Sequence, residues 1–259
     1  MRLLVIGDVV GRPGRRAVKA NVGGLKREFD LDLVIANGEN AAGGNGITRE
    51  VGQELFNSGV DVITMGNHVW SKKDSYDYIN KEVRIVRPAN YPPGAPGTGV
   101  NIFETHRKVK VVVINLSGRV FLPPLDCPFR KVDEILSRVK EEARTVVVDF
   151  HAEATSEKIA MGWYLAGRVS AVFGTHTHVQ TADEQILPGG TAYITDLGMT
   201  GPRDSVIGVK KDLVIDKFIS QLPVRFEVAT GLFQFNGAVI DIDEETGEAK
   251  NIRRIQNFE

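Results

Sequence analysis

The stretch "SAVFGTHTHVQT", residues 170–181, joins a short apolar run to a pair of histidines, and its pattern recurs along the chain. The run at 170–173 is typical of a buried strand, and Gly174 allows the backbone to turn after it. In extended backbone His176 and His178 point to the same side, where they could reach neighbouring metal ions. The alternative is an exposed polar strand end without a ligand.

Four earlier stretches have the same form, an apolar run followed by residues that bind metals or move protons. They are "LLVIGD" (3–8), "LVIANGEN" (33–40), "VITMGNH" (62–68) and "TVVVDFH" (145–151), and they end in Asp8, Glu39 and Asn40, Asn67 and His68, and His151. Parallel strands of an α/β sheet end at one edge, where ligands bind, so we expect these side chains to converge. A single Asp or His after a strand is often only a cap or a half-buried polar group. Five such coincidences would be needed to explain the pattern away.

The candidate ligands are carboxylates, amide oxygens and imidazoles, without a thiolate. This set suits Mn, Fe or Zn better than Cu(I) or an iron–sulfur cluster. Cys127 is the one cysteine of the chain and lies outside the pattern, so we interpret it as a packing or surface residue. One cysteine cannot form an intramolecular disulfide, which fits a reducing compartment.

Composition argues against several other classes. The 259 residues include 32 Lys plus Arg and 33 Asp plus Glu, so no overall charge excess indicates a nucleic-acid or membrane partner. The apolar start "MRLLVIGD" is too short for a secretory segment, and no stretch approaches the roughly 20 apolar residues that span a bilayer. We predict a cytoplasmic protein with a single domain over residues 1–259.

Apolar runs alternate with amphipathic stretches, which predicts βα units around a mainly parallel sheet. The predicted helices cover Pro13–Phe29, Thr48–Asn57 and Pro128–Ala143, although Gly23-Gly24 weakens the first. Phe226–Ile242 and Lys250–Ile255 instead predict antiparallel strands joined by a turn at Thr246-Gly247. The fold class is therefore α/β with two sheets and helices outside. The Pro-rich loop 87–99 either walls a substrate site, with Tyr91 as a stacking surface, or is a structural connection.

At the strand ends the sequence resembles the calcineurin-like metallophosphoesterases. Their blocks GDxHG, GDxxD, GNH, a lone His and GHxH correspond here to "GDVVGR", "GENAAGG", "GNHVW", "DFHAE" and "GTHTHVQT". The similarity is greatest to the YmdB-type branch, bacterial proteins associated with hydrolysis of cyclic nucleotides, in which Glu-Asn replaces the central Asp. It runs through the whole chain, including "SGVDVITMGNH", "RPANYPPGAPG" and "DFHAEATSEK".

The resemblance implies a four-layer αββα sandwich with two mixed β-sheets and two metal ions, iron as first choice and Mn or Zn as alternatives. By position, Asp8, Asn40 and His178 would hold one ion, Glu39 would bridge, and Asn67, His151 and His176 would complete the second site. His68 would donate a proton to the leaving group. The superfamily has a ligand histidine where this chain has Val10, and Asn40 is the natural replacement.

The expected activity is hydrolysis of a cyclic nucleotide, with a 2′,3′-cyclic ribonucleotide such as 2′,3′-cAMP as first choice. Two ions against the two charges of Asp8 and Glu39 leave a positive centre that attracts a phosphodiester, which a metal-activated hydroxide attacks in line. A small-molecule phosphodiester is the expected partner; the resemblance also favours a homo-oligomer, and we expect neither a membrane nor a stable nucleic-acid partner. A phosphomonoesterase acting on phosphoproteins is the rival enzyme. An RNA- or nucleotide-binding regulator with vestigial hydrolysis is the rival of another class, with Arg12, Arg15 and Arg16 either contacting phosphates or forming a solvated helix face.

Overall fold

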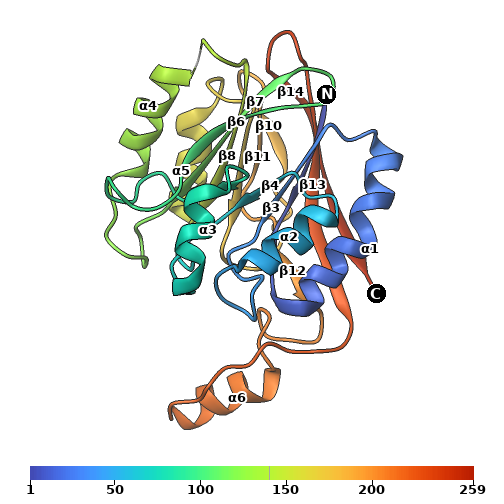
Figure 1. Cartoon of the computed structure of the whole chain (residues 1–259), viewed down its shortest axis with the longest axis vertical. Helices are drawn as coiled ribbons and strands as arrows, with labels where there is room; N and C mark the ends of the chain where they lie inside the picture. Colours follow the sequence, from blue (N-terminus) through green and yellow to red (C-terminus); the bar gives the residue numbers. More distant parts are fainter. Residues whose placement is uncertain (140) are drawn as a thin grey trace.

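The computed structural model describes residues 1–139 and 141–259. Two mixed β-sheets stack on each other and helices cover their outer faces (Figure 1). The predicted four-layer αββα sandwich is therefore confirmed. Among the described helices, none combines the length and apolar character needed to cross a bilayer.

The first sheet has eight strands in the described part of the chain, in the order β2-β12-β13-β1-β3-β4-β5, with β14 beside β13. Strands β1, β3, β4 and β5 run parallel, whereas β13 is antiparallel to both β1 and β14. The bounds are β1 Arg2–Ile6, β2 Asp8–Val9, β3 Leu33–Asn37, β4 Val62–Thr64, β5 Ile85–Val86, β12 Met199–Pro202, β13 Phe233–Ile242 and β14 Ala249–Phe258.

Among the described residues the second sheet has six strands, in the order β10-β11-β9-β8-β7-β6. Its central strands β7, β8, β9 and β11 run parallel, and the edge strands β6 and β10 are antiparallel to their neighbours. The bounds are β6 Val100–Glu104, β7 Lys110–Ser117, β8 Thr145–His151, β9 Ala171–Thr175, β10 Gln185–Leu187 and β11 Thr191–Ile194.

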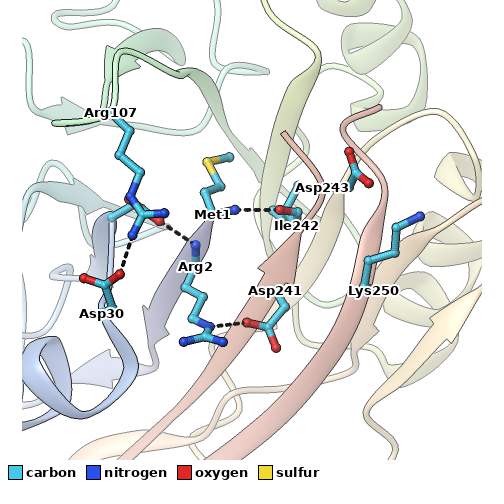
Figure 2. Close-up of a pocket in the computed structure, with 9 residues that line it drawn as sticks. Met1, Arg2, Asp30, Arg107, Asp241, Ile242, Asp243 and Lys250 are labelled. Carbon is cyan, nitrogen blue, oxygen red and sulfur yellow. Dashed lines mark hydrogen bonds and ion pairs between the residues drawn. The ribbon is translucent and has the colours of Figure 1, made fainter. Parts of the chain in front are cut away.

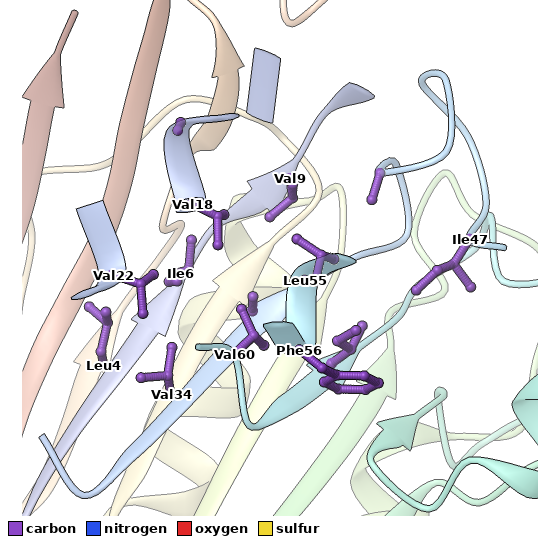
Figure 3. Close-up of a cluster of buried hydrophobic side chains, with 14 of the residues drawn as sticks. Leu4, Ile6, Val9, Val18, Val22, Val34, Ile47, Leu55, Phe56 and Val60 are labelled. Atoms are coloured by element: carbon purple, nitrogen blue, oxygen red, sulfur yellow. The ribbon is translucent and has the colours of Figure 1, made fainter. Parts of the chain in front are cut away.

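Strand β1 shows why the sheets are sandwiched. Leu3 and Val5 contribute to the core between the two sheets, while Leu4 and Ile6 face the helices. Both faces are buried because side chains alternate along a strand, so the strand reads as a continuous apolar run. Figure 3 shows the helix-side cluster of the first sheet, with these labelled members: Leu4, Ile6, Val9, Val18, Val22, Val34, Ile47, Leu55, Phe56 and Val60.

Helices α1, α2 and α3 cover the first sheet, and α4 and α5 cover the second. Helix α6 instead projects away from the sandwich at the bottom of the view (Figure 1). The bounds are α1 Gly11–Phe29, α2 Arg49–Asn57, α3 Tyr76–Lys81 after a 3₁₀ turn at Lys73–Ser75, α4 Pro128–Val139, α5 Thr155–Leu165 and α6 Lys211–Ser220.

The predicted helices differ from the observed ones mainly at their ends. Helix α1 is continuous through Gly23-Gly24, and Thr48 caps α2 by accepting a hydrogen bond from the Val51 N–H at 3.3 Å. Helix α4 is observed to Val139; residue 140 of its predicted span lies outside the described residues, and 141–143 are not helical.

The predicted strand 226–242 is too long, although the β13–β14 hairpin is confirmed. Strand β13 begins at Phe233, and before it Val228 makes only an isolated bridge to Val209. The segment 226–232 therefore pairs with the connection after β12 and not with the sheet, and this places it beside the candidate site.

Candidate metal centre

All eight predicted site residues gather where strands of the two sheets end. Asp8 follows β1, Glu39 and Asn40 follow β3, and Asn67 and His68 follow β4. In the second sheet His151 is the last residue of β8, and His176 and His178 follow β9. Glu39 and Asn67 of the first sheet contact His151 of the second, so the predicted convergence at the carboxyl ends of the strands is observed.

The imidazole of His151 is the centre of one group of potential ligands. Its Nε2 lies 2.9 Å from Asn67 Oδ1, 3.1 Å from Glu39 Oε1 and 3.0 Å from His176 Nδ1. One ring nitrogen carries at most one hydrogen and cannot satisfy three polar neighbours. Ligand atoms about 2.1 Å from a shared ion, at right angles, lie about 3 Å apart. The spacing therefore fits a cation among these four side chains better than a hydrogen-bonded cluster.

A second group lies around Asp8, whose side chain is fully buried. Asp8 Oδ2 accepts a hydrogen bond from the His176 N–H at 3.0 Å, but Oδ1 has no hydrogen-bond partner among the described residues and faces His178 Nε2 at 3.8 Å. Asn40 approaches the same His178 nitrogen to 3.2 Å. A buried carboxylate oxygen without a partner is costly, and a cation would compensate it. The residues therefore fit a metal ion here as well.

Glu39 connects the two groups. Its Oε1 faces His151 and also lies 3.3 Å from the Asn40 amide, while Oε2 accepts the His68 N–H at 2.8 Å. Burial alone would raise the pKa of Glu39, but the charge and hydrogen bond of His151, together with the His68 charge and backbone N–H, lower the pKa to about 2. Burial alone would likewise lower the pKa of His151, but the Glu39 carboxylate, with the charges of Asp8 and Asp149, raises it to about 9. Glu39 is thus ionised at the position expected of a bridging ligand.

The prediction of extended backbone at the two histidines after β9 is wrong. His176 has φ 101° and His178 has φ 67°, both left-handed conformations. The cause lies in Asp196, whose Oδ2 accepts hydrogen bonds from the Thr177 N–H at 3.2 Å and from Thr177 Oγ1 at 2.7 Å. Held in this turn, His176 joins the His151 group and His178 joins the Asp8 group.

Each histidine of the centre has a partner on its other ring nitrogen. His178 Nδ1 donates to Ile207 O at 2.8 Å, and His176 Nε2 lies 3.0 Å from Glu153. His151 Nδ1 lies 2.9 Å from Thr175 Oγ1, which donates to Asp149 at 2.7 Å. Such contacts fix ring orientation and leave the opposite nitrogen available for a metal.

Two buried residues that support the site, Asp196 and Lys158, were not predicted from the sequence. Asp196 follows β11 just as Asp8 follows β1, so the same strand-end rule would have found it had β11 been recognised. Lys158 gave no sequence signal, yet its Nζ lies 2.5 Å from Asp196 and the side chain is only 2% exposed. The ion pair of Lys158 and Asp196 joins helix α5 to the turn at 176–178 that carries the two histidines.

A cleft of about 440 Å³ opens beside the centre. Its polar side includes Glu39, Asn40, His68, His176 and His178, and the opposite wall is apolar. Within the part of the chain that the structure describes, neither lysine nor arginine lines this cleft.

A different, highly charged pocket lies at the amino-terminal end of β1 (Figure 2). There Arg2 pairs with Asp241 at 2.7 Å and Arg107 pairs with Asp30, and none of the eight candidate residues lines it. Its acidic side chains pair with basic ones, as Asp241 does with Arg2. At the opposite ends of the strands, potential metal ligands instead face one another.

The loop 87–99 fits the structural interpretation. Arg87 donates three hydrogen bonds to backbone carbonyls of its own loop, and Tyr91 packs edge-on against Trp70 with ring centroids 5.6 Å apart. Neither Tyr91 nor the half-buried Cys127 lines the cleft.

Two of the three arginines that follow β2, Arg15 and Arg16, also have protein partners. Arg15 Nε binds Glu54 at 2.6 Å, and Arg16 binds Glu259 at 3.1 Å. These ion pairs favour the solvated helix face over a phosphate-binding patch.

Comparison with known proteins agrees with the geometry. A family model described as YmdB-like protein matches residues 4–255. A Bacillus subtilis protein named 2′,3′-cyclic-nucleotide 2′-phosphodiesterase is 54% identical over 255 residues, 98% of this chain and 96% of the relative.

Solved structures extend the comparison. A Mycoplasma pneumoniae protein described as a novel phosphatase superposes with a TM-score of 0.93 at 38% identity, covering 100% of this chain and 93% of the other. A hypothetical protein from Thermus thermophilus gives a TM-score of 0.94 at 43% identity with full coverage of both chains.

Proposed function

Because this chain belongs to the YmdB-like family, we propose that it is a metal-dependent phosphodiesterase that opens 2′,3′-cyclic nucleotides. The observation that carries the proposal is the buried, unpaired Asp8 Oδ1 next to the Glu39–His151 cluster. Bound cations would compensate the charge of this buried carboxylate. Cations next to an open cleft can in turn bind a phosphate.

We assign one ion to Asp8, Asn40 and His178, the second to Asn67, His151 and His176, with Glu39 between them. The amide of Asn40 can present its oxygen to the first ion after a half-turn of the side chain. When bound, the ions would neutralise phosphate charge and lower the pKa of a water molecule. Iron is our first choice, with manganese or zinc as alternatives, because the donor set contains no thiolate.

His68 is the proposed proton donor. Its backbone N–H is fixed on Glu39, and its Nδ1 lies 3.4 Å from Ser71 Oγ. The imidazole lines the cleft, so its Nε2 can hand a proton to the departing ribose oxygen. A poor leaving group of this kind gains most from a general acid.

The cleft favours a diester over a monoester. A phosphodiester carries one negative charge, whereas a monoester near neutral pH carries up to two. Among the described residues that line the cleft there is neither lysine nor arginine, and Glu153 adds a carboxylate. The ions would therefore supply the positive charge, which suits the singly charged substrate better.

The test is turnover of a substrate panel by metal-loaded protein of known metal content. We expect hydrolysis of 2′,3′-cAMP, weaker hydrolysis of linear diesters and little release of phosphate from a phosphoserine peptide or p-nitrophenyl phosphate. His176→Ala is the control and should lose both metal and turnover. Strong monoester turnover with none of the cyclic substrate would instead establish the rival phosphomonoesterase. Tight, salt-sensitive RNA binding by metal-free protein would favour the regulator.

We further propose a cytoplasmic homo-oligomer. The single cysteine is consistent with a reducing compartment. Ile219 on α6 is 79% exposed and Leu222 just after it is 64% exposed, and such apolar surface is typical of a subunit contact. Light scattering should show a mass above 28.4 kDa that falls in Ile219→Glu; a monomeric wild type would contradict the proposal.

A further inference from the structure

The wall of the cleft opposite the metal centre is apolar, and its two aromatic side chains are exposed. It is built by the connection between β12 and β13, mainly Ile207, Val214, Phe218, Phe226 and Val228. Phe218 is 73% exposed and Phe226 is 46% exposed, with Lys217 Nζ 5.1 Å from the centroid of the Phe226 ring. Exposure of large apolar side chains to water is energetically unfavourable, so these two residues suit a ligand that covers them. We infer that this wall holds the nucleobase of the substrate by stacking, an inference that rests on the proposed function.

The wall is held next to the metal centre by hydrogen bonds and packing contacts. Ile207 O accepts the hydrogen bond from His178 Nδ1 at 2.8 Å. Val228 packs against the loop after β3, since a Cβ added to Gly44 would lie 2.6 Å from Val228 Cγ2. Val228 also bridges to Val209. A base resting on the wall would thus keep a defined position relative to a phosphate at the candidate ligands.

Val10 extends the same apolar lining toward the centre. It is 3% exposed and lines the cleft, and a Cβ added to Gly208 would lie 2.9 Å from Val10 Cγ1. A valine here removes a metal ligand but continues the apolar surface from the wall to the ligands. The cleft therefore has one polar side for a phosphate and one apolar side for a planar ring.

The chemistry of the wall predicts how the base is recognised. The side chains of Ile207, Phe218, Phe226 and Val228 carry neither donors nor acceptors, so they contact a ring face and cannot distinguish base edges. Every base has such a face, and stacking on an aromatic side chain is tolerant of sequence. We therefore expect similar KM values for 2′,3′-cyclic AMP, GMP, CMP and UMP, and a much higher KM for a cyclic diester without a base.

The experiment compares Phe226→Ala with Phe258→Ala. Phe258 is a matched control because it is 55% exposed and does not line the cleft. The substrates are 2′,3′-cAMP and the base-free glycerol 1,2-cyclic phosphate. Phe226→Ala should lower the ratio of kcat/KM for the nucleotide to that for the base-free substrate about tenfold, through KM, because one stacking contact is lost. Phe258→Ala should leave this ratio unchanged.

Other outcomes separate the two proposals. If wild type hydrolyses both substrates with equal kcat/KM and Phe226→Ala changes nothing, the inference is wrong and the proposed function stands. If wild type hydrolyses neither, the proposed function fails, and calorimetric binding of 3′-AMP then tests the wall, which Phe226→Ala should weaken about tenfold. A Phe226→Ala variant with a lower mass in light scattering and an unchanged substrate ratio would mean that a second copy covers the wall, which would also overturn the inference.

Discussion

Replacement of Lys158 by methionine should lower the free energy of unfolding strongly, because it removes one partner of a buried ion pair. Lys158 on α5 lies 2.5 Å from Asp196, with side-chain exposures of 2% and 1%. Methionine keeps most of the apolar stem and removes the charge. The variant therefore leaves Asp196 as a buried carboxylate without its cation.

Removal of one partner from a buried ion pair costs about 3–5 kcal/mol. Asp196 would retain hydrogen bonds from Thr177 and from the Gly198 N–H at 2.8 Å, which moderate the loss. We therefore expect the free energy of unfolding to fall by about 3 kcal/mol and, for a chain of this size, the Tm to fall by about 6–12 °C. Because Asp196 also holds Thr177, the variant should bind metal more weakly.

Urea unfolding followed by circular dichroism, with a chelator present, measures the loss without a contribution from bound metal. Lys131→Met is the matched control, since its ion pair with Glu134 at 2.7 Å is on the surface and should contribute under about 1 kcal/mol. The double variant Lys158→Met/Asp196→Asn should cost less than the sum of the two single variants by about 1–3 kcal/mol. Equal losses for Lys158→Met and Lys131→Met would refute the role assigned to the buried pair.

Further substitutions test the centre itself. His68→Ala should lower kcat by about 10²–10⁴-fold and keep its metal in elemental analysis, whereas joint loss of metal would make His68 a ligand. Gly66→Ala should lose metal and activity, because its Cβ would lie 2.3 Å from His151 Nε2. Gly24→Ala, whose Cβ would meet nothing within 4 Å, should raise the free energy of unfolding by about 0.5–1 kcal/mol and leave activity unchanged. A chelator should abolish turnover, and readdition of Fe, Mn or Zn should identify the metal that restores it.

The convergence of the site was predictable because it depends on short patterns. Runs such as Leu3–Ile6 are continuous and apolar because both faces of a strand are buried in a sandwich, and parallel strands end at one edge. Local sequence and this rule therefore place Asp8 at the edge of the first sheet and His151 at the edge of the second, and the stacking of the two sheets brings them together although 143 positions separate them (151 − 8).

The backbone at His176 and His178 could not be predicted in the same way. Their left-handed conformation depends on Asp196, which follows the four-residue strand β11 and reaches back to Thr177. The sequence predicts a strand at Phe226, but this residue precedes β13 and its side chain lines the cleft. Apolar character alone does not distinguish a core strand from a binding wall.

The contacts around the centre indicate that Glu39, Asp8 and His178 are positioned before a metal binds. Glu39 is held by the His68 N–H, Asp8 by the His176 N–H and His178 by Ile207 O, and none of these bonds requires an ion. In small zinc domains the metal provides the folding free energy, but here the sandwich core already does so. Metal-free protein should therefore keep its far-ultraviolet circular dichroism and lose only the stability that binding adds, about 2.7 kcal/mol at a free metal concentration one hundred times Kd. The unpaired Asp8 Oδ1 then destabilises the metal-free fold. An ion that binds Oδ1 removes this unfavourable term and is bound more tightly for that reason.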